Sequence, residues 1–379
     1  MTKKAPFIYL DHNATTPVHP EVLEAMLPYF SIVYGNAASN TYGLGLRAKS
    51  AVDQARETVA DLLHVHPQEI TFTSGATEAL NTAIKGIFWR YAVKGKHFIT
   101  LPTEHKAVLD TLKWLETQGA EVHYLQVDRE GMIDLQELED HIRTDTIAVI
   151  AMLANNETGV IQPIARIAEI VHRKSSILIC DATQAIGKIP VDLPSLGADV
   201  FALSAHKFYG PKGVGALYLK RRNPRVSIDA LIHGGGHERG NRSGTLNVPG
   251  IAGLGKAAAL VPGFIKIYEE KITPVRDFLS TELIEAQLAD INSFHAPRIP
   301  NTLNIKLAGI KAETVIKHLQ DKVALATGSA CSSADPRPSH VLMAMGLSAE
   351  EAHHTLRISL GIDNTMEEAE IFLNLLKNL

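Results

Sequence analysis

The chain has 379 residues, of which 45% are hydrophobic and 21% are charged, values typical of a globular protein with a substantial core. Its formal net charge of −4 argues against direct binding of nucleic acid or of a membrane surface, because such proteins usually carry a basic face. Only two cysteines are present, no apolar run approaches a membrane span, and the first residues do not resemble a signal peptide, so we expect a cytoplasmic protein.

Seven short apolar runs predict strands, and segments with helical periodicity separate most of them. The segment 164–174, for example, has apolar residues at Ile164, Ile167 and Val171, which is a helical spacing. This alternation predicts an α/β fold with a mostly parallel central sheet flanked by helices. The predicted strands cover residues 69–73, 97–102, 121–127, 146–153, 176–180, 199–204 and 213–220.

The pattern changes near Pro262. A helical stretch from about residue 263 to residue 288 precedes short strands and further helices, which is an α+β arrangement. We therefore expect a large domain of residues 15–262, and a smaller domain made of residues 1–14 and 263–379.

Polar segments follow five of the predicted strands, at the point where each strand ends. In an open parallel sheet, ligands bind outside the carboxyl ends of the strands. We therefore expect these segments to form one binding site. They are residues 74–81, 103–110, 154–163, 181–188 and 205–213.

Two of these segments contain groups suited to an anion and to a ring nitrogen. Gly75 permits a tight turn into a helix, and the first N–H groups of that helix could bind an anion, although a plain N-cap by Ser74 or Thr77 is the alternative. Asp181 directly follows an apolar strand, so its carboxylate needs a cationic partner. A protonated heterocyclic nitrogen would serve, and an N-cap or a structural ion pair is the alternative.

Lys207 also follows an apolar strand, in a turn bounded by Gly210. A partly desolvated lysine is a good Schiff-base nucleophile, whereas a solvated surface lysine is the alternative. An anion site, an acid for a ring nitrogen and an activated lysine are together what pyridoxal phosphate (PLP) requires. Cys180 ends an apolar strand, and we expect it to be an unreactive core residue.

The chain resembles the cysteine desulfurases of the iron–sulfur-cluster and nitrogen-fixation type, which are class-V aminotransferases with the PLP-dependent transferase fold type I. The resemblance extends from Tyr9 to the segment that begins at Thr355, which is nearly the whole chain. The motifs that carry it are TSGATE, TEHKAVLD, NNETGV, DATQ, AHKFYGPKG, GGGHERGNRSGT and GSACSS.

The resemblance implies a role for each matching residue. Lys207 would form the Schiff base with PLP, Asp181 would keep the pyridine nitrogen protonated, and His105 would stack on the ring and assist proton transfer. Arg357 would bind the substrate carboxylate, a task suited to a planar guanidinium. The other implied PLP contacts are Asn156 and Gln184 near the ring hydroxyl, and Ala76, Thr77, Ser204 and His206 at the phosphate, joined by Thr245 from the neighbouring subunit of a homodimer.

Cys331 lies in a segment rich in glycine, serine and proline, which a reactive thiol that moves between two positions requires. In the family this cysteine takes sulfur from L-cysteine as a persulfide, and alanine is released. The expected partners are L-cysteine and a sulfur-acceptor protein of iron–sulfur cluster assembly or tRNA thiolation. A selenocysteine lyase, a related PLP-dependent lyase or aminotransferase, and a non-catalytic scaffold protein are the alternatives.

No metal site is expected. Six other histidines show no metal-ligand spacing with cysteine or acidic residues. They are His64, His66, His233, His237, His353 and His354.

Overall fold

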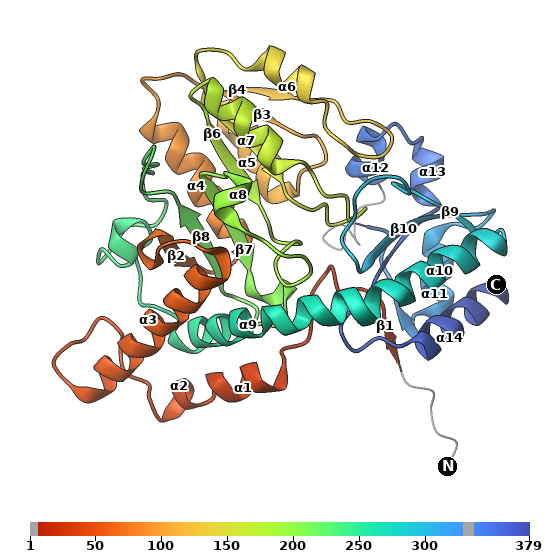
Figure 1. Ribbon diagram of the computed structural model, residues 1–379, viewed down its shortest axis with the longest axis horizontal. Coiled ribbons are helices and arrows are strands. Elements are labelled where there is room, and N and C mark those ends of the chain that lie inside the picture. The colour runs from red at the N-terminus through yellow and green to blue at the C-terminus, as the bar shows by residue number, and fades with distance from the viewer. Residues whose placement is uncertain (1–6, 329–336) are drawn as a thin grey trace.

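Seven strands form the central sheet of the computed structural model, which describes residues 7–328 and 337–379 (Figure 1). Their order is β2-β8-β7-β6-β5-β3-β4, and β8 alone runs against the others, so the sheet is mostly parallel as predicted. The strands are β2 (Ile70–Thr73), β3 (His97–Thr100), β4 (Glu121–Tyr124), β5 (Thr146–Met152), β6 (Ile177–Asp181), β7 (Val200–Ser204) and β8 (Gly215–Leu219).

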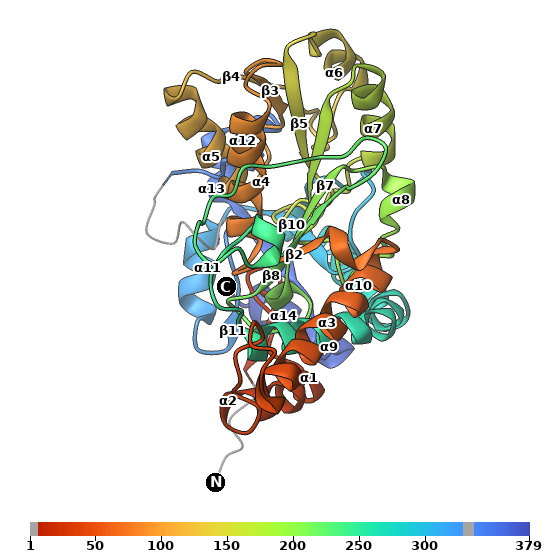
Figure 2. The ribbon, with the colours of Figure 1, turned by 90° about the vertical axis from the view of Figure 1, so that its left-hand side faces the viewer.

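Helices cover both faces of this sheet, and this is why β5 is buried along its whole length (Figure 2). The helices α4 (Ala76–Arg90) and α5 (Lys106–Thr117) pack against one face, in a cluster that includes Ile150 and Ile179. On the other face, the helices contribute to a cluster that includes Val149 and Leu178. They are α3 (Gly43–Leu63), α6 (Leu135–His141), α7 (Ile164–Arg173), α8 (Leu193–Leu196) and α9 (Val248–Ile267).

A smaller antiparallel sheet, in the order β12-β10-β9, lies in the C-terminal part of the chain. A parallel pair, β1 and β11, brings residues 8 and 9 to this part of the molecule. The expected smaller domain, made of residues 1–14 and 263–379, requires such a contact. The division into this domain and a large domain of residues 15–262 stays a prediction. The remaining elements are β1 (Ile8–Tyr9), β9 (Ala289–Ile291), β10 (Thr302–Leu307), β11 (Val323–Ala324), β12 (Thr355–Ser359), α1 (Pro20–Met26), α2 (Pro28–Ser31), α10 (Thr273–Glu285), α11 (Ala312–Leu319), α12 (His340–Ala344), α13 (Ala349–His353) and α14 (Met366–Lys377).

The helix expected from residue 263 begins much earlier. It starts at Val248, passes Pro262 and continues through a π-helical segment into α10, so it runs lengthwise beneath both sheets (Figure 1). Proline interrupts an isolated helix, but buried residues such as Leu254 and Ala258 keep α9 in place. By length and composition the segment Val248–Glu285 could cross a membrane, yet 56% of its most apolar window is buried inside the protein, as in a core helix.

A buried ion pair fixes the segment that carries Thr245 to the edge of the central sheet. The guanidinium of Arg56 in α3 donates to the Glu238 carboxylate at 2.6 and 2.8 Å, and Glu238 also accepts the N–H of Phe72 in β2. Both side chains are almost fully buried. Removing one partner would leave the other charge without compensation.

We therefore expect Arg56→Met to lower the free energy of unfolding by about 3 to 5 kcal/mol, because Glu238 would be buried without its cation. Lys49→Met is the matched control in the same helix, since the Lys49–Asp53 pair is exposed, and it should change stability by less than about 0.5 kcal/mol. Urea unfolding followed by circular dichroism measures both values. Equal stabilities for the two variants would contradict the assignment.

Candidate active site

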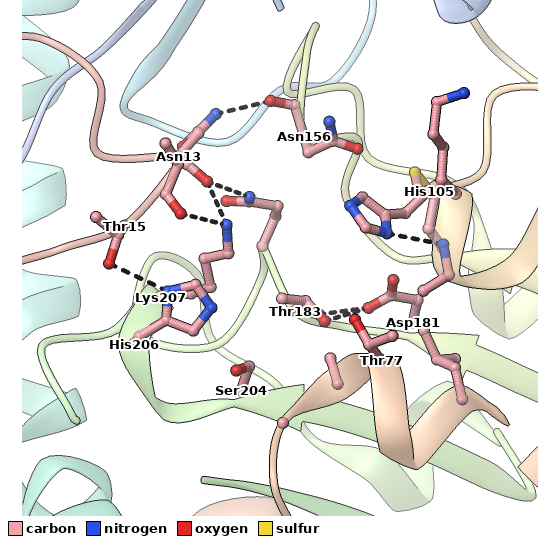
Figure 3. Close-up of a pocket in the computed structure, with 18 of the residues that line it drawn as sticks. Asn13, Thr15, Thr77, His105, Asn156, Asp181, Thr183, Ser204, His206 and Lys207 are labelled. Carbon is pink, nitrogen blue, oxygen red and sulfur yellow. Dashed lines mark hydrogen bonds between the residues drawn. The ribbon is translucent and has the colours of Figure 1, made fainter. Parts of the chain in front are cut away.

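A cavity of about 460 Å³ opens at the carboxyl ends of the parallel strands, where the sequence predicts the binding site (Figure 3). Its walls come from the segments after β2, β3, β5, β6 and β7, and also from the N-terminal segment and β12. The predicted site residues that line it are Ala76, Thr77, His105, Asn156, Asp181, Gln184, Ser204, His206, Lys207 and Arg357.

Lys207 ends a short 3-10 helix that follows β7. Its ammonium nitrogen donates to the main-chain carbonyl oxygens of Asn13 at 2.6 Å and Ala14 at 2.8 Å. The N-terminal segment therefore forms one wall of the site. Figure 3 shows Asn13 and Thr15 beside Lys207 and His206.

Asp181 is the last residue of β6 and is 5% exposed. The N–H of Thr183 donates to Oδ1 at 2.9 Å, and the Thr183 hydroxyl donates to the same oxygen. Both bonds go to Oδ1, so Oδ2 remains available to a donor in the cavity. Nearby, burial and the negative charge of Asp181 raise the pKa of Glu104 well above its usual range, so Glu104 stays protonated.

His105 caps α5, and its Nδ1 accepts the N–H of Ala107 at 3.0 Å. Burial lowers the pKa of His105, and the charge of Lys207 contributes to the same shift, although Asp181 opposes it. The imidazole is therefore neutral, and its proton is on Nε2 because Nδ1 acts as an acceptor. A neutral ring can stack on another aromatic ring and still donate a hydrogen bond from Nε2.

The N-terminus of α4 also lines the cavity and is suited to an anion. Gly75, the N-cap of the 15-residue helix α4, has φ +149°, a conformation that L side chains rarely adopt, and it turns the first N–H groups of α4 toward the cavity. Ser204 and His206 line the same region. Burial, together with Lys207 and Lys212, lowers the pKa of His206 to about 4, so this ring is neutral at physiological pH.

Arg357 projects from β12 and is 2% exposed. Its guanidinium donates to Asp11 Oδ1 at 2.6 Å and to the carbonyl oxygens of Asn156 at 2.9 Å and Gly328 at 2.6 Å. These bonds fix the guanidinium plane at the edge of the cavity. A substrate carboxylate there would meet an oriented cation.

One predicted residue lies elsewhere, and another belongs to a segment that the structure does not describe. Thr245 is exposed and does not line this cavity. Cys331 lies outside the described residues. Cys180 is fully buried, and burial raises the pKa of its thiol well above the usual value, which confirms that it is an unreactive core residue.

Residue-by-residue reasoning missed several groups of the site. Asn13 and Thr15 come from a segment that no strand of the central sheet precedes, so its position at the sheet edge was not expected. The YLDHN motif at Tyr9 to Asn13, which begins the family resemblance, was the only signal. The other missed cavity residues include Thr183, Lys212 and His340.

These side chains fit PLP. The Asp181 carboxylate can accept the N–H of a pyridinium, the Lys207 amine can bind an aldehyde, and the N-terminus of α4 can bind a phosphate. The three groups come from different strands and open into one cavity. Their chemistry matches the three functional groups of the cofactor.

One group of side chains in the described part of the chain has the composition of a metal site. Its members are His123 in β4 and Glu137 and His141 in α6, and their candidate ligand atoms lie within 4.8 Å of one another. The two rings are stacked, however, with centroids 4.0 Å apart and planes 17° apart. An ion binds in the plane of each imidazole, and these planes do not meet between the rings. We assign no metal here, and the expectation of none stays a prediction.

Comparisons with known proteins agree with this chemistry. A protein named cysteine desulfurase IscS from Anaeromyxobacter dehalogenans is 49% identical over 369 residues, which are 97% of this chain and 91% of that protein. A protein of the same name from Klebsiella pneumoniae is 47% identical over 373 residues, with 98% and 92% covered.

Solved structures show the same fold. A NifS-like protein superposes with a TM-score of 0.91 at 39% identity, over 98% of this chain and 99% of that one. A structure described as SspA in complex with cysteine superposes with a TM-score of 0.81 at 36% identity, over 93% and 99% of the two chains. The family model described as aminotransferase class-V matches residues 8–372, and the chain belongs to that family.

Proposed function

We propose that this chain is a PLP-dependent cysteine desulfurase, which takes sulfur from L-cysteine and releases L-alanine. The observation that carries the proposal is the convergence of Lys207, Asp181 and Arg357 on one cavity, from three different strands. Relatives that are 46–49% identical have the name cysteine desulfurase, and a solved relative was described in complex with cysteine. Both facts support the same reaction.

PLP, when bound, supplies an electron sink for the amino acid. The residues of the chain bind and orient the reactants and move protons. Arg357 binds the substrate carboxylate, and Asp181 holds a proton on the ring nitrogen through Oδ2. The amine of Lys207 takes the substrate's Cα proton and returns it to the product. His105 can donate from Nε2 over the ring.

Cys331 would accept the sulfur. The C–S bond of L-cysteine breaks, an S–S bond forms to the Cys331 sulfur, and the proton from the Cys331 thiol completes the methyl group of alanine. The products are alanine and a protein persulfide, so no external oxidant or reductant is needed. An acceptor protein of iron–sulfur cluster assembly or tRNA thiolation would then take the sulfur. This chemistry needs a reduced thiol, which supports a cytoplasmic location.

We also propose a homodimer in which Thr245 reaches the phosphate of the neighbouring site. Thr245 is exposed and lines no wall of the cavity in its own chain. In addition, α1 to α3 and the segment between α2 and α3 expose large apolar side chains that a second copy would cover. They are Leu23, Leu27, Phe30, Ile32, Tyr34 and Leu46.

Borohydride reduction of the purified enzyme should attach PLP to Lys207, because reduction makes the lysine–aldehyde bond permanent. Peptide mass spectrometry identifies the labelled residue. Lys207→Arg keeps the positive charge but cannot form the bond, so it should lose the label and reduce kcat by at least about 100-fold. Labelling at Lys188 or Lys212 instead would overturn the assignment.

Cys331→Ser should abolish sulfide release from L-cysteine and leave the absorption of bound PLP unchanged, because only the sulfur acceptor is lost. Cys180→Ala is the matched control and should retain activity, since Cys180 is buried away from solvent. Activity is measured as alanine and sulfide produced under a reductant. Full activity of Cys331→Ser would remove the persulfide step, and activity retained on selenocysteine alone would favour a selenocysteine lyase.

Mixed dimers test the role of Thr245. A dimer with Thr245→Asp in one subunit and Lys207→Ala in its partner should keep about half of the wild-type activity, because one composite site combines both native residues. Each homodimer of a single variant should be nearly inactive, whereas Thr245→Ser should resemble the wild type. An inactive mixed dimer, or a monomer in solution, would contradict the proposal.

A further inference from the structure

A second lysine lies directly behind the cavity. Lys188, in the turn after β6, is 1% exposed and does not line the cavity itself. Its side-chain nitrogen donates to Asn13 Oδ1 at 2.9 Å and to Gln184 Oε1 at 2.5 Å. Within residues 7–328 and 337–379, no carboxylate pairs with it, so amide oxygens are its partners.

The bond to Gln184 fixes the orientation of that side-chain amide. Lys188 donates, so Oε1 must face it and Nε2 must face the other way. Nε2 donates to the carbonyl oxygen of Asn13 at 2.9 Å, which uses one of its two N–H bonds. The second N–H is available to an acceptor in the cavity that Gln184 lines.

The bond to Asn13 orients the residue that holds the Lys207 amine. The main-chain oxygen of Asn13 accepts from both Lys207 and Gln184. Its side chain is fixed by Lys188 and Asn301 at Oδ1, and by its own donation to Thr302. A displacement of Asn13 would therefore move both groups that face the cofactor.

The surroundings of Lys188 are energetically unfavourable for a charged amine. Burial lowers the pKa of Lys188 well below its usual value, and the charges of Lys207 and Arg357 lower it further. A buried amine in repulsive surroundings adds little stability by itself. Its hydrogen bonds to two groups of the site are what it contributes.

We propose that Lys188 is a positioning residue of the desulfurase, which holds the Gln184 amide as a donor toward the cofactor and keeps Asn13 in place beneath Lys207. The inference rests on the proposed function, because it takes PLP to be the ligand of the cavity. Lys188 touches neither substrate nor cofactor. Its effect is transmitted through the two amides.

The test is a pH titration of the absorption band of bound PLP. Lys188→Met should raise the midpoint by about one pH unit, since Gln184 loses its fixed orientation and the ring hydroxyl region loses an N–H donor. The same variant should lower kcat by at least about tenfold with little change in KM, because Arg357 still binds the substrate. Lys220→Met is the control, since Lys220 pairs with Asp199 and lines no part of the cavity.

A double-mutant cycle separates transmission through Gln184 from a direct effect. In a Gln184→Leu background, Lys188→Met should add little further shift of the midpoint, and independent, additive shifts would overturn the inference. Lys188→Gln, which is one bond shorter, provides a second variant if Lys188→Met does not fold, and an intermediate shift is expected. A wild-type midpoint in every folded Lys188 variant overturns this inference alone. A wild-type protein without a PLP band overturns the proposed function as well.

Discussion

Lys207 donates two hydrogen bonds, to the carbonyl oxygens of Asn13 and Ala14. These bonds connect the central sheet to the N-terminal segment. Lys207 follows a central strand, whereas Asn13 follows a strand that pairs with the C-terminal part of the chain. The amine, which follows a strand of the central sheet, is therefore oriented by two carbonyl groups of the N-terminal segment. A lysine held in this way would have fewer conformations to lose on binding an aldehyde.

The cavity is lined by the acidic side chain of Asp181 and by the basic side chains of Lys207 and Arg357. Asp181 presents its carboxylate to the cavity, and burial, together with Asp181, raises the pKa of the neighbouring Glu104. Lys207 and Arg357 also line the cavity, and their charges lower the pKa of Lys188, which lies outside it. Partly buried charges of this kind act on a bound group more strongly than they would in solvent.

The substrate site depends equally on both parts of the molecule. Arg357 comes from the smaller sheet, yet its guanidinium donates to the carbonyl oxygen of Asn156, which follows β5 of the central sheet. The continuous segment from Val248 to Glu285 runs beneath both sheets and packs against α3 (Figure 1). This continuous helical segment connects the part of the chain that carries Arg357 to the part that carries Lys207 and Asp181.

The sequence alone determined where the strands of the central sheet lie along the chain and at which edge of that sheet the site forms. Apolar runs marked every strand of the central sheet, and the polar segments after them contained Asp181, His105 and Lys207, because parallel strands end at a common edge. Only the tertiary structure revealed the contributions of Asn13 and Lys188, and the start of the long helix at Val248. These depend on contacts between residues far apart in the chain, such as Asn13 and Lys188, and periodicity reports only on near neighbours.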